Sequence, residues 1–310
     1  MPPLCRSDLL ALPACDEDKA FAMVIAHEET VVTPGLTFLQ CALLHTSSSG
    51  ERRIRVHTMA VPVVTELHEM YRATDGGAMA AMCSKLAAER VYNGRLEEAR
   101  QSLQAKVFAT LKEYRLLHAS SARAYNRLVF PDSMRLLPLY TLATAKAAAL
   151  RGGFKDVPSD VRAMSAFDLI AMPISRLLRY LYPAAYAVHL APPPGGGPAP
   201  PPLPPLIPLC GDRVDARGAY LVDNAVELLL WLGAQMPTDL VEGLIGLPAV
   251  PPDAARVLAG LAPQPAPASQ ALWALISQLR AASPVFLPLR VCAQGQASEV
   301  RPGAAPVACY

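Results

Sequence analysis

"SSSGERRIRVHTMAVPV", residues 47–63, is the stretch that decides the fold of the first part of the chain. Ser47–Gly50 is typical of a tight turn, because Gly50 can take the positive φ that such a turn needs. An apolar run, Leu36–Thr46, precedes the turn, and the alternating segment Glu51–Val61 follows it. The sequence therefore predicts two strands joined in a hairpin.

Three arginines stand within four positions of the second strand. Side chains of a strand alternate between its two faces, so Arg53 and Arg55 share one face with His57. Ile54 and Val56 lie on the other face, together with Arg52, and we expect these two apolar residues to point into a core.

The arginines have two interpretations. They contact something negative, or they are structural and pair with Glu51, Glu66 or Glu69. The structural interpretation is favoured, because arginines on strands are commonly structural and exposed ion pairs contribute little.

Composition excludes several classes of function. The net charge is +2, so there is no overall attraction for nucleic acid, although residues 66–180 carry 17 Lys and Arg against 11 Asp and Glu. The seven cysteines form no CxxC pair and the six histidines have no metal-ligand spacing. No nucleophile elbow or phosphate-binding loop is present. We therefore expect no enzyme, no cofactor and no metal site.

The amino terminus carries no pattern of a secretory signal. The most apolar run, Val226–Met236, is too short to span a bilayer. Together with the scattered cysteines, this predicts a cytosolic protein whose membrane contact is peripheral.

The first two thirds of the chain show two kinds of periodicity. A short apolar run, Ala20–His27, adds a further strand to the predicted hairpin. From about Thr65 the period changes to that of helices, and the sequence predicts four of them. They cover residues 77–92, 95–119, 131–150 and 158–181.

The third of these helices has its own signals. Pro138 cannot donate its amide, so the helix must kink or restart there, and Gly152 and Gly153 end it. Because residues 131–150 are apolar nearly all round, we expect this helix in the middle of a bundle.

The last third begins with a Pro- and Gly-rich stretch, residues 191–208, which is typical of a loop or linker. Beyond it the sequence predicts adjacent strands at 219–224 and 226–233, a helix after Pro237, a helix at 269–281 and a strand at 285–295. We expect Trp231 and Trp273 to pack inside this unit.

Three strings resemble one family in their order along the chain. They are "LQCALLHTSSSGERRIRVHTMAVPV" (39–63), "LVFPDSMRLLPLYTLATAKAAALRGG" (128–153) and the Tyr182–Pro183 pair. This order resembles the cargo-adaptor subunit of the COPII inner coat, the Sec-twenty-four family. "GAYLVDNAVELLLWLGAQMPTDLVEGLIG" (218–246) resembles the gelsolin-like module of that family.

The resemblance implies a multidomain mixed fold: a partial β-sandwich, an all-α helical bundle and a C-terminal gelsolin-like α/β domain. The corresponding ranges are an unstructured leader at 1–17, the sandwich at 18–64, the helical domain at 65–182 and the gelsolin-like domain at 183–310. The family's N-terminal arm, zinc ribbon and trunk have no counterpart here, so we expect a truncated form or a fragment.

The resemblance also implies a function. It predicts a non-enzymatic coat component in transport from the endoplasmic reticulum to the Golgi, peripheral on the cytosolic face of the membrane. Its partners would be the sister inner-coat subunit and the tails of cargo proteins, with a small GTPase and the outer coat as indirect partners. Arg52, Arg53 and Arg55 would then contact acidic lipid headgroups.

Three alternatives remain open from the sequence. A gelsolin-like module suggests an actin-regulatory protein, the helices suggest a scaffold outside any coat, and a reactive cysteine would suggest a Cys/His hydrolase.

Overall fold

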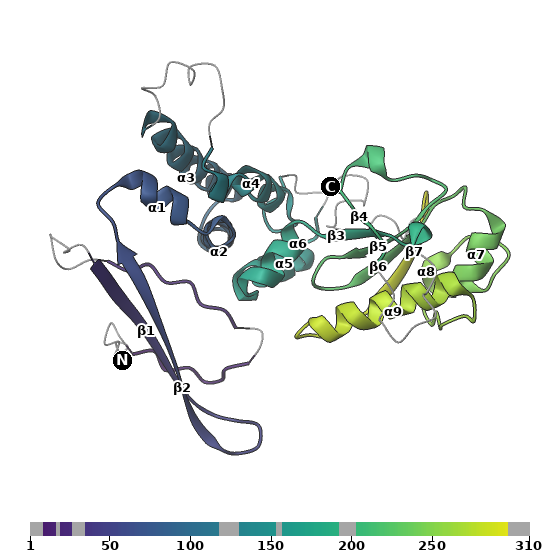
Figure 1. Cartoon of the computed structure of the whole chain (residues 1–310), viewed down its shortest axis with the longest axis horizontal. Coiled ribbons are helices and arrows are strands. Elements are labelled where there is room, and N and C mark those ends of the chain that lie inside the picture. Colours follow the sequence, from purple (N-terminus) through teal and green to yellow (C-terminus); the bar gives the residue numbers. More distant parts are fainter. Residues whose placement is uncertain are drawn as a thin grey trace. The chain divides into compact units, whose positions relative to one another are not determined.

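The computed structural model describes residues 9–16, 19–26, 35–117, 130–152, 157–191 and 203–296. The chain divides into two compact units. One unit combines Met1–Asp75 with Leu111–Arg135, and the other combines Gly76–Thr110 with Leu136–Tyr310. Figure 1 labels the elements of both.

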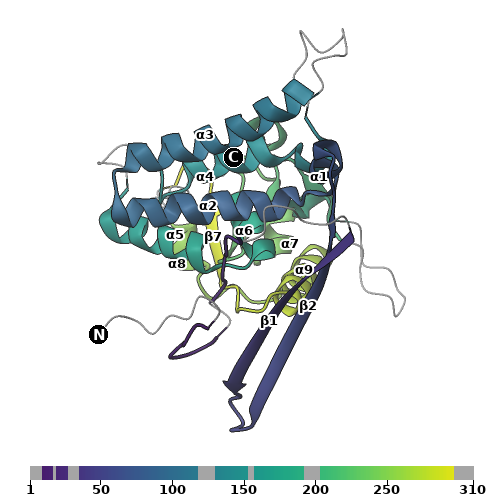
Figure 2. The ribbon, with the colours of Figure 1, turned by 90° about the vertical axis from the view of Figure 1, so that its left-hand side faces the viewer.

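A long hairpin is the main feature of the first unit. It consists of β1 (Gly35–Thr46) and β2 (Arg52–Val63), which lie side by side in Figure 2. The strands pair antiparallel without a break, from Gly35 opposite Val63 to Thr46 opposite Arg52. The predicted hairpin is confirmed.

The strand predicted at Ala20–His27 is wrong for the residues that can be compared. Residues 20–26 have no regular structure, and the side chain of Val24 is 81% exposed; His27 lies outside the described residues. A strand needs a hydrogen-bonded neighbour, and none of the described strands pairs with this segment.

Short helical elements follow the hairpin in the same unit. They are α1 (Leu67–Ala73) and η1 (Asp132–Met134), and α3 (Leu96–Leu117) contributes its last residues. The ring of Tyr71 meets that of Tyr114 edge to face, with centroids 5.1 Å apart. The hydroxyl of Ser133 donates to the carbonyl of Tyr71 at 2.6 Å, so residues far apart in sequence are joined here.

The second unit begins with helices packed around α2 (Gly76–Asn93), which contacts α4 (Leu137–Lys146), α5 (Ser159–Ala171) and α6 (Ile174–Leu181). The buried positions of α2 are small, with Ala80, Ala81, Ala87 and Ala88 all at 3% exposure or less. Small side chains let neighbouring helices approach closely. The Ser84 hydroxyl is hydrogen-bonded to that of Thr144 at 2.7 Å, so α2 and α4 are also joined in the buried interior.

The expectation that residues 131–150 form a central helix is wrong in two respects. Helix α4 covers only Leu137–Lys146, and its Leu142 is 54% exposed, so α2 and not α4 is the central helix. Pro138 lies in the first turn of α4, where a missing amide proton costs nothing. The predicted restart at this proline is what the structure shows.

A five-stranded sheet forms the rest of the second unit, in the order β4-β3-β5-β6-β7. The strands are β3 (Ala184–Ala187), β4 (Leu206–Ile207), β5 (Ala219–Asp223), β6 (Leu228–Leu232) and β7 (Leu289–Ala293). All neighbours are antiparallel except β6 and β7, which are parallel.

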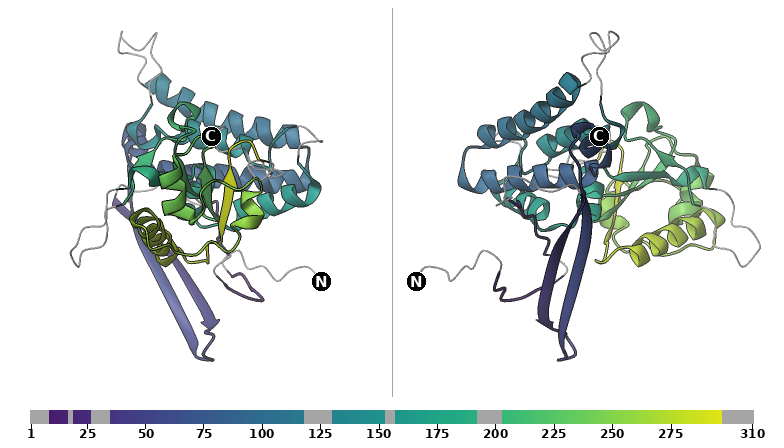
Figure 3. Two further views of the ribbon diagram at one scale, coloured as in Figure 1. Left: turned by 90° about the vertical axis from the view of Figure 1, so that its right-hand side faces the viewer. Right: turned by 60° about the vertical axis from the view of Figure 1, so that its left-hand side comes forward.

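A parallel pair needs a long crossover, and here it consists of three helices. They are α7 (Thr238–Ile245), α8 (Ala254–Val257) and α9 (Pro267–Ala282), which lie against the sheet in Figure 3. Their apolar side chains share one buried core with the sheet: Leu272 of α9 and the sheet residues Leu221 and Leu230 are all fully buried in it.

Part of the stretch predicted as a loop or linker belongs to this sheet. Residues 192–202 lie outside the described residues, but Leu206–Ile207 pair with β3 as strand β4. Two short 3-10 helices lie in the connections between the strands. They are η2 (Val188–Leu190), which follows β3, and η3 (Gly211–Arg213), which lies between β4 and β5.

Candidate functional site

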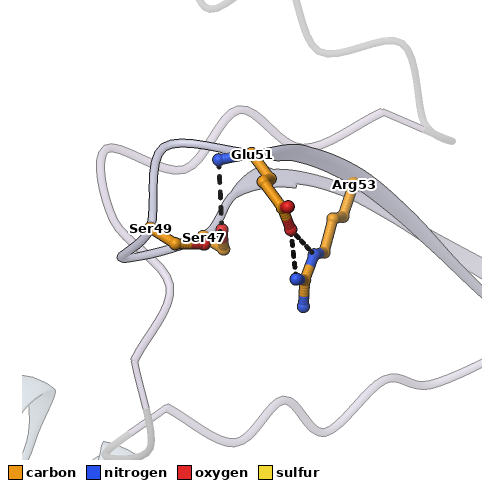
Figure 4. Close-up of polar contacts among 4 residues, drawn as sticks. All are labelled: Ser47, Ser49, Glu51 and Arg53. Atoms are coloured by element: carbon orange, nitrogen blue, oxygen red, sulfur yellow. Dashed lines mark hydrogen bonds and ion pairs between the residues drawn. The ribbon is translucent and has the colours of Figure 1, made fainter.

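The turn between β1 and β2 is fixed by its own serines. The backbone of Ser47 accepts a hydrogen bond from Gly50 at 2.9 Å and donates to Glu51 at 2.8 Å. The Ser47 hydroxyl accepts from the amide of Glu51 at 3.2 Å and is hydrogen-bonded to that of Ser49 at 2.8 Å (Figure 4). Gly50 has φ +84°, the conformation for which glycine is favoured.

The basic face of the hairpin follows from the register. We use this name for Arg53, Arg55, His57 and His45. Arg53 lies opposite His45, Arg55 opposite Leu43, and His57 opposite Cys41. Residues paired across an antiparallel ladder point to the same side, so these side chains form one row along the strands.

The ion pairs of the three predicted arginines differ. Arg53 donates from Nε to the carboxylate of Glu51 at 3.0 Å, and its Nη2 contacts the same oxygen (Figure 4). Both side chains are more than half exposed, at 54% and 62%, so the pair is worth little. Within the described residues, Arg52 and Arg55 have no ion pair, and Glu66 and Glu69 pair with none of the three.

The structure does not bring the three arginines together on one surface. Arg53 and Arg55 lie on the basic face, whereas Arg52, opposite Thr46, points to the other side of the hairpin. Any ligand that meets a flat surface would therefore contact two of them and not three.

The expectation that Ile54 and Val56 point into a core is wrong. Ile54 is 69% exposed and Val56 is 53% exposed. The alternation correctly placed them on the apolar side of the strand, but the hairpin is a two-stranded sheet among the described residues, and no second layer covers that side.

The first strand carries a further exposed apolar row that the sequence-based prediction did not include. Leu36, Phe38 and Leu44 are 63%, 64% and 53% exposed and share the side of Ile54 and Val56. The signal in "LTFLQCALL" is weak, because the alternate positions Thr37, Leu39, Cys41 and Leu43 are also mostly apolar.

Both tryptophans lie in the unit that holds the five-stranded sheet. Trp231 is 3% exposed and its ring lies 5.7 Å from that of Tyr220, centroid to centroid. Trp273 is partly buried and packs against the core between the sheet and its helices. Its indole Nε1 is buried and has no hydrogen-bond partner among the described residues.

Cysteine chemistry is poorly supported by this arrangement. Burial raises the pKa of the Cys83 thiol, with Lys106 acting in the opposite direction, and a raised pKa disfavours the reactive thiolate. Cys41 lies opposite His57 in the ladder, but both are exposed and no hydrogen bond between them is present in the described part of the chain. The described residues therefore contain no buried pair of cysteine nucleophile and histidine base that would support the hydrolase alternative.

The acidic residues Asp215 and Asp223, near the sheet, each bind a different partner. The carboxylate of Asp223 lies 3.8 Å from the guanidinium of Arg179 and accepts from the backbone amide of Ala225 at 2.9 Å. The carboxylate of Asp215 accepts from the backbone amide of Arg217 at 2.9 Å. Among the described residues, no group of three His, Cys, Asp or Glu side chains is placed to hold a metal ion. No described helix combines the length and apolar character needed to cross a membrane.

Two family models match adjoining parts of the chain. Residues 3–64 match the Sec23/Sec24 beta-sandwich domain, and residues 75–179 match the Sec23/Sec24 helical domain. The match at 3–64 includes the hairpin, and the match at 75–179 covers helices α2 to α5 and most of α6.

Relatives extend the match to most of the chain. Protein transport protein SEC24 A of Arabidopsis thaliana is 40% identical over 288 residues, which is 92% of this chain and 28% of the relative. Protein transport protein SEC24 of Coccidioides immitis is 38% identical over 246 residues, 78% of this chain and 26% of the relative. The chain thus spans a little over a quarter of the length of these relatives.

A solved structure shows the same fold. The crystal structure of the human COPII-coat protein Sec24c matches with a TM-score of 0.71 and 26% identity, over 87% of this chain and 35% of that one. The predicted mixed fold class, with sandwich and helical domains, is confirmed, and the α/β sheet unit is consistent with the gelsolin-like domain of this architecture. The family models, the relatives and the structural match agree that this chain belongs to the Sec24 family.

Proposed function

We propose that this chain acts as a cargo-adaptor component of the COPII coat in transport from the endoplasmic reticulum to the Golgi. The observation that carries the proposal is the 40% identity to a SEC24 transport protein over 92% of the chain. Identity at this level extends through the hairpin, the helices and the sheet unit, so it does not depend on one shared module.

The proposed mechanism is binding and not catalysis. The chain would pair with the sister inner-coat subunit and take part in holding short signals in the tails of cargo proteins, with a small GTPase and the outer coat as indirect partners. Single peptide contacts of this kind are weak, and a polymerising coat adds them into a strong attachment. No residue of this chain is assigned to a contact with cargo.

A reconstituted recruitment assay tests this function. The full chain is incubated with acidic liposomes, the sister subunit and the small GTPase loaded with a non-hydrolysable GTP analogue, and liposomes are then floated. We expect the chain to float only when the sister subunit is present. Absence from the floated fraction, in an assay where a longer SEC24 relative floats, would contradict the proposal.

We also propose that the basic face of the hairpin contacts acidic lipid on the cytosolic side of the endoplasmic reticulum. Arg55 has no ion pair among the described residues, and Arg53 holds only an exposed one. Each such charge near an anionic membrane is worth about 1 kcal/mol, and salt screens the attraction.

The lipid contact is tested by replacing the two arginines of the basic face together, Arg53→Ala and Arg55→Ala. Liposomes rich in phosphatidylserine should then retain at least about tenfold less of the coat at moderate salt. A control variant removes two exposed positive charges from helices α2 and α3 instead, with Arg90→Ala and Lys112→Ala. Equal binding by the two variants would show that only net charge matters and that the hairpin makes no specific contact.

A further inference from the structure

An acidic residue, Glu51, lies at the turn end of the basic face of the hairpin. Its carboxylate accepts a hydrogen bond from Nε of Arg53 at 3.0 Å, and Nη2 of Arg53 contacts the same carboxylate oxygen (Figure 4). One of the two arginines for which we propose a lipid contact is therefore already bound to an anion of the chain itself.

The turn holds the backbone of Glu51 in place. The carbonyl of Glu51 accepts from the amide of Ser47 at 2.8 Å, and the amide of Glu51 donates to the Ser47 hydroxyl at 3.2 Å. Gly50, with φ +84°, turns the chain immediately before this residue. Because both backbone groups of Glu51 are bonded to the opposite strand end, its side chain starts from a fixed position two residues before Arg53.

The contact with Glu51 occupies one edge of the Arg53 guanidinium. A guanidinium binds a carboxylate or a phosphate most strongly when two N–H groups of one edge donate to it together. In Arg53 the edge formed by Nε and Nη2 is directed at Glu51. A lipid headgroup must displace Glu51 to use this edge, whereas Arg55 has no such competitor among the described residues.

We propose that Glu51 limits the affinity of the basic face for acidic lipid, because its carboxylate competes with the headgroup for Arg53. This inference rests on the lipid contact proposed above and assigns unequal shares of that contact to the two arginines. Arg55 supplies most of the attraction. Arg53 contributes fully only when the carboxylate of Glu51 is removed.

The competition is local to Arg53. A strand rises about 3.3 Å per residue, so Arg53 is roughly 7 Å along the strand from Glu51, and Arg55 is roughly 13 Å away. The screening length in physiological salt is about 8 Å, so the carboxylate acts on Arg53 and hardly on Arg55.

The exposure of the pair sets the size of the effect. The side chains of Arg53 and Glu51 are 54% and 62% exposed, and breaking an exposed ion pair costs little. A free arginine near an anionic surface raises binding about fivefold. The cost of breaking the pair should reduce the share of Arg53 to about twofold, so Glu51 weakens the lipid contact without abolishing it.

The variant Glu51→Gln tests the inference, because it removes the charge and keeps the size of the side chain. In the recruitment assay with the full chain, titrated with phosphatidylserine liposomes, it should raise the apparent affinity at least about twofold. Liposomes of phosphatidylcholine alone should show no gain. The matched control is Glu98→Gln in α3, where an exposed glutamate likewise pairs with an arginine, Arg95, at 4.0 Å. It changes the net charge equally and should leave binding unaltered.

A double-mutant cycle separates competition from net charge. Arg53→Ala should weaken binding about twofold in the unaltered chain and about fivefold in the Glu51→Gln chain. Arg55→Ala should weaken it about fivefold in both. If charges simply added, Arg53→Ala would have the same effect in the two chains.

Three outcomes would overturn the inference while the lipid contact stands, provided that Arg55→Ala still weakens binding. They are no gain from Glu51→Gln, an equal gain from Glu98→Gln, or equal losses from Arg53→Ala in the two chains. If Arg53→Ala and Arg55→Ala both leave liposome binding unchanged in either chain, the lipid contact itself is wrong, and the competition with it.

Discussion

Glu227 and Arg290 form the ion pair with the most specific geometry among the described residues. Arg290 donates from Nε at 3.1 Å and from Nη2 at 3.0 Å to the two carboxylate oxygens of Glu227. The side chains are only 24% and 10% exposed, so both charges are largely removed from water. The pair joins the start of β6 to β7, the two parallel strands.

The substitution Arg290→Ala should lower the free energy of unfolding by about 2–3 kcal/mol, because it leaves the carboxylate of Glu227 largely buried without this partner. Urea denaturation followed by circular dichroism measures the loss. Arg217→Ala, at an exposed arginine, is the control and should change stability by less than about 0.5 kcal/mol. A loss at position 290 no larger than the control would show that the pair is not a stabilising contact.

Cys83 gives a dependence of stability on pH. Burial raises its pKa above the ordinary value of 9.0, so the folded thiol stays protonated at a pH where the unfolded thiol ionises. Ionisation stabilises the unfolded state, and the contribution of Cys83 to stability is therefore complete below pH 9 and falls as the pH rises further.

The difference in unfolding free energy between the unaltered chain and Cys83→Ala should consequently shrink by on the order of 0.5–1 kcal/mol between about pH 7 and about pH 9.5. Parallel urea titrations at the two pH values measure it, and subtraction removes the titration of all other groups. A difference that stays constant or grows with pH would contradict the assignment.

Helix α4 shows that a proline has different effects in the first turn of a helix and in its interior. Pro138→Ala should change stability by less than about 1 kcal/mol, because the first turn does not use the missing amide proton. Thr141→Pro, one turn further, should cost about 3 kcal/mol or more. Thermal unfolding compares the two variants, and similar losses would mean that α4 begins later than the structure places it.

The start of α4 was predictable from Pro138, whereas its end was not. Gly152 and Gly153 indicated an end near residue 151, but the helix stops at Lys146. Arg100 of α3 donates to the carbonyls of Ala145 and Leu150, at 2.7 and 2.6 Å, so a side chain distant in sequence satisfies groups that a longer helix would have used. Arg162 of α5 does the same for residues 148, 149 and 151.

The hairpin shows a similar limit for the candidate site. Alternation predicted which side chains share a face, and Arg53 and Arg55 do lie together. It did not predict whether a second layer covers Ile54, because that depends on strands that must come from elsewhere. Burial of one face is a property of the assembled fold and not of the strand.

At the scale of the whole molecule, the order of the motifs was more informative than any single one. "GERRIRVHT" and "LLPLYTLA" lie far apart, yet their order predicted the family to which the chain belongs. The predicted domain boundaries after residues 17, 64 and 182 stay predictions. So does the assignment of a lipid contact to Arg52, Arg53 and Arg55.

Direct binding to the sister inner-coat subunit tests the coat function at this scale. Sedimentation velocity of the two purified proteins, alone and mixed at about 10 µM, should show a new boundary with the mass of a one-to-one complex. The variant that combines Arg53→Ala and Arg55→Ala should still form it, because these changes affect the lipid contact and not the protein one. Two boundaries that remain those of the separate proteins would contradict the account.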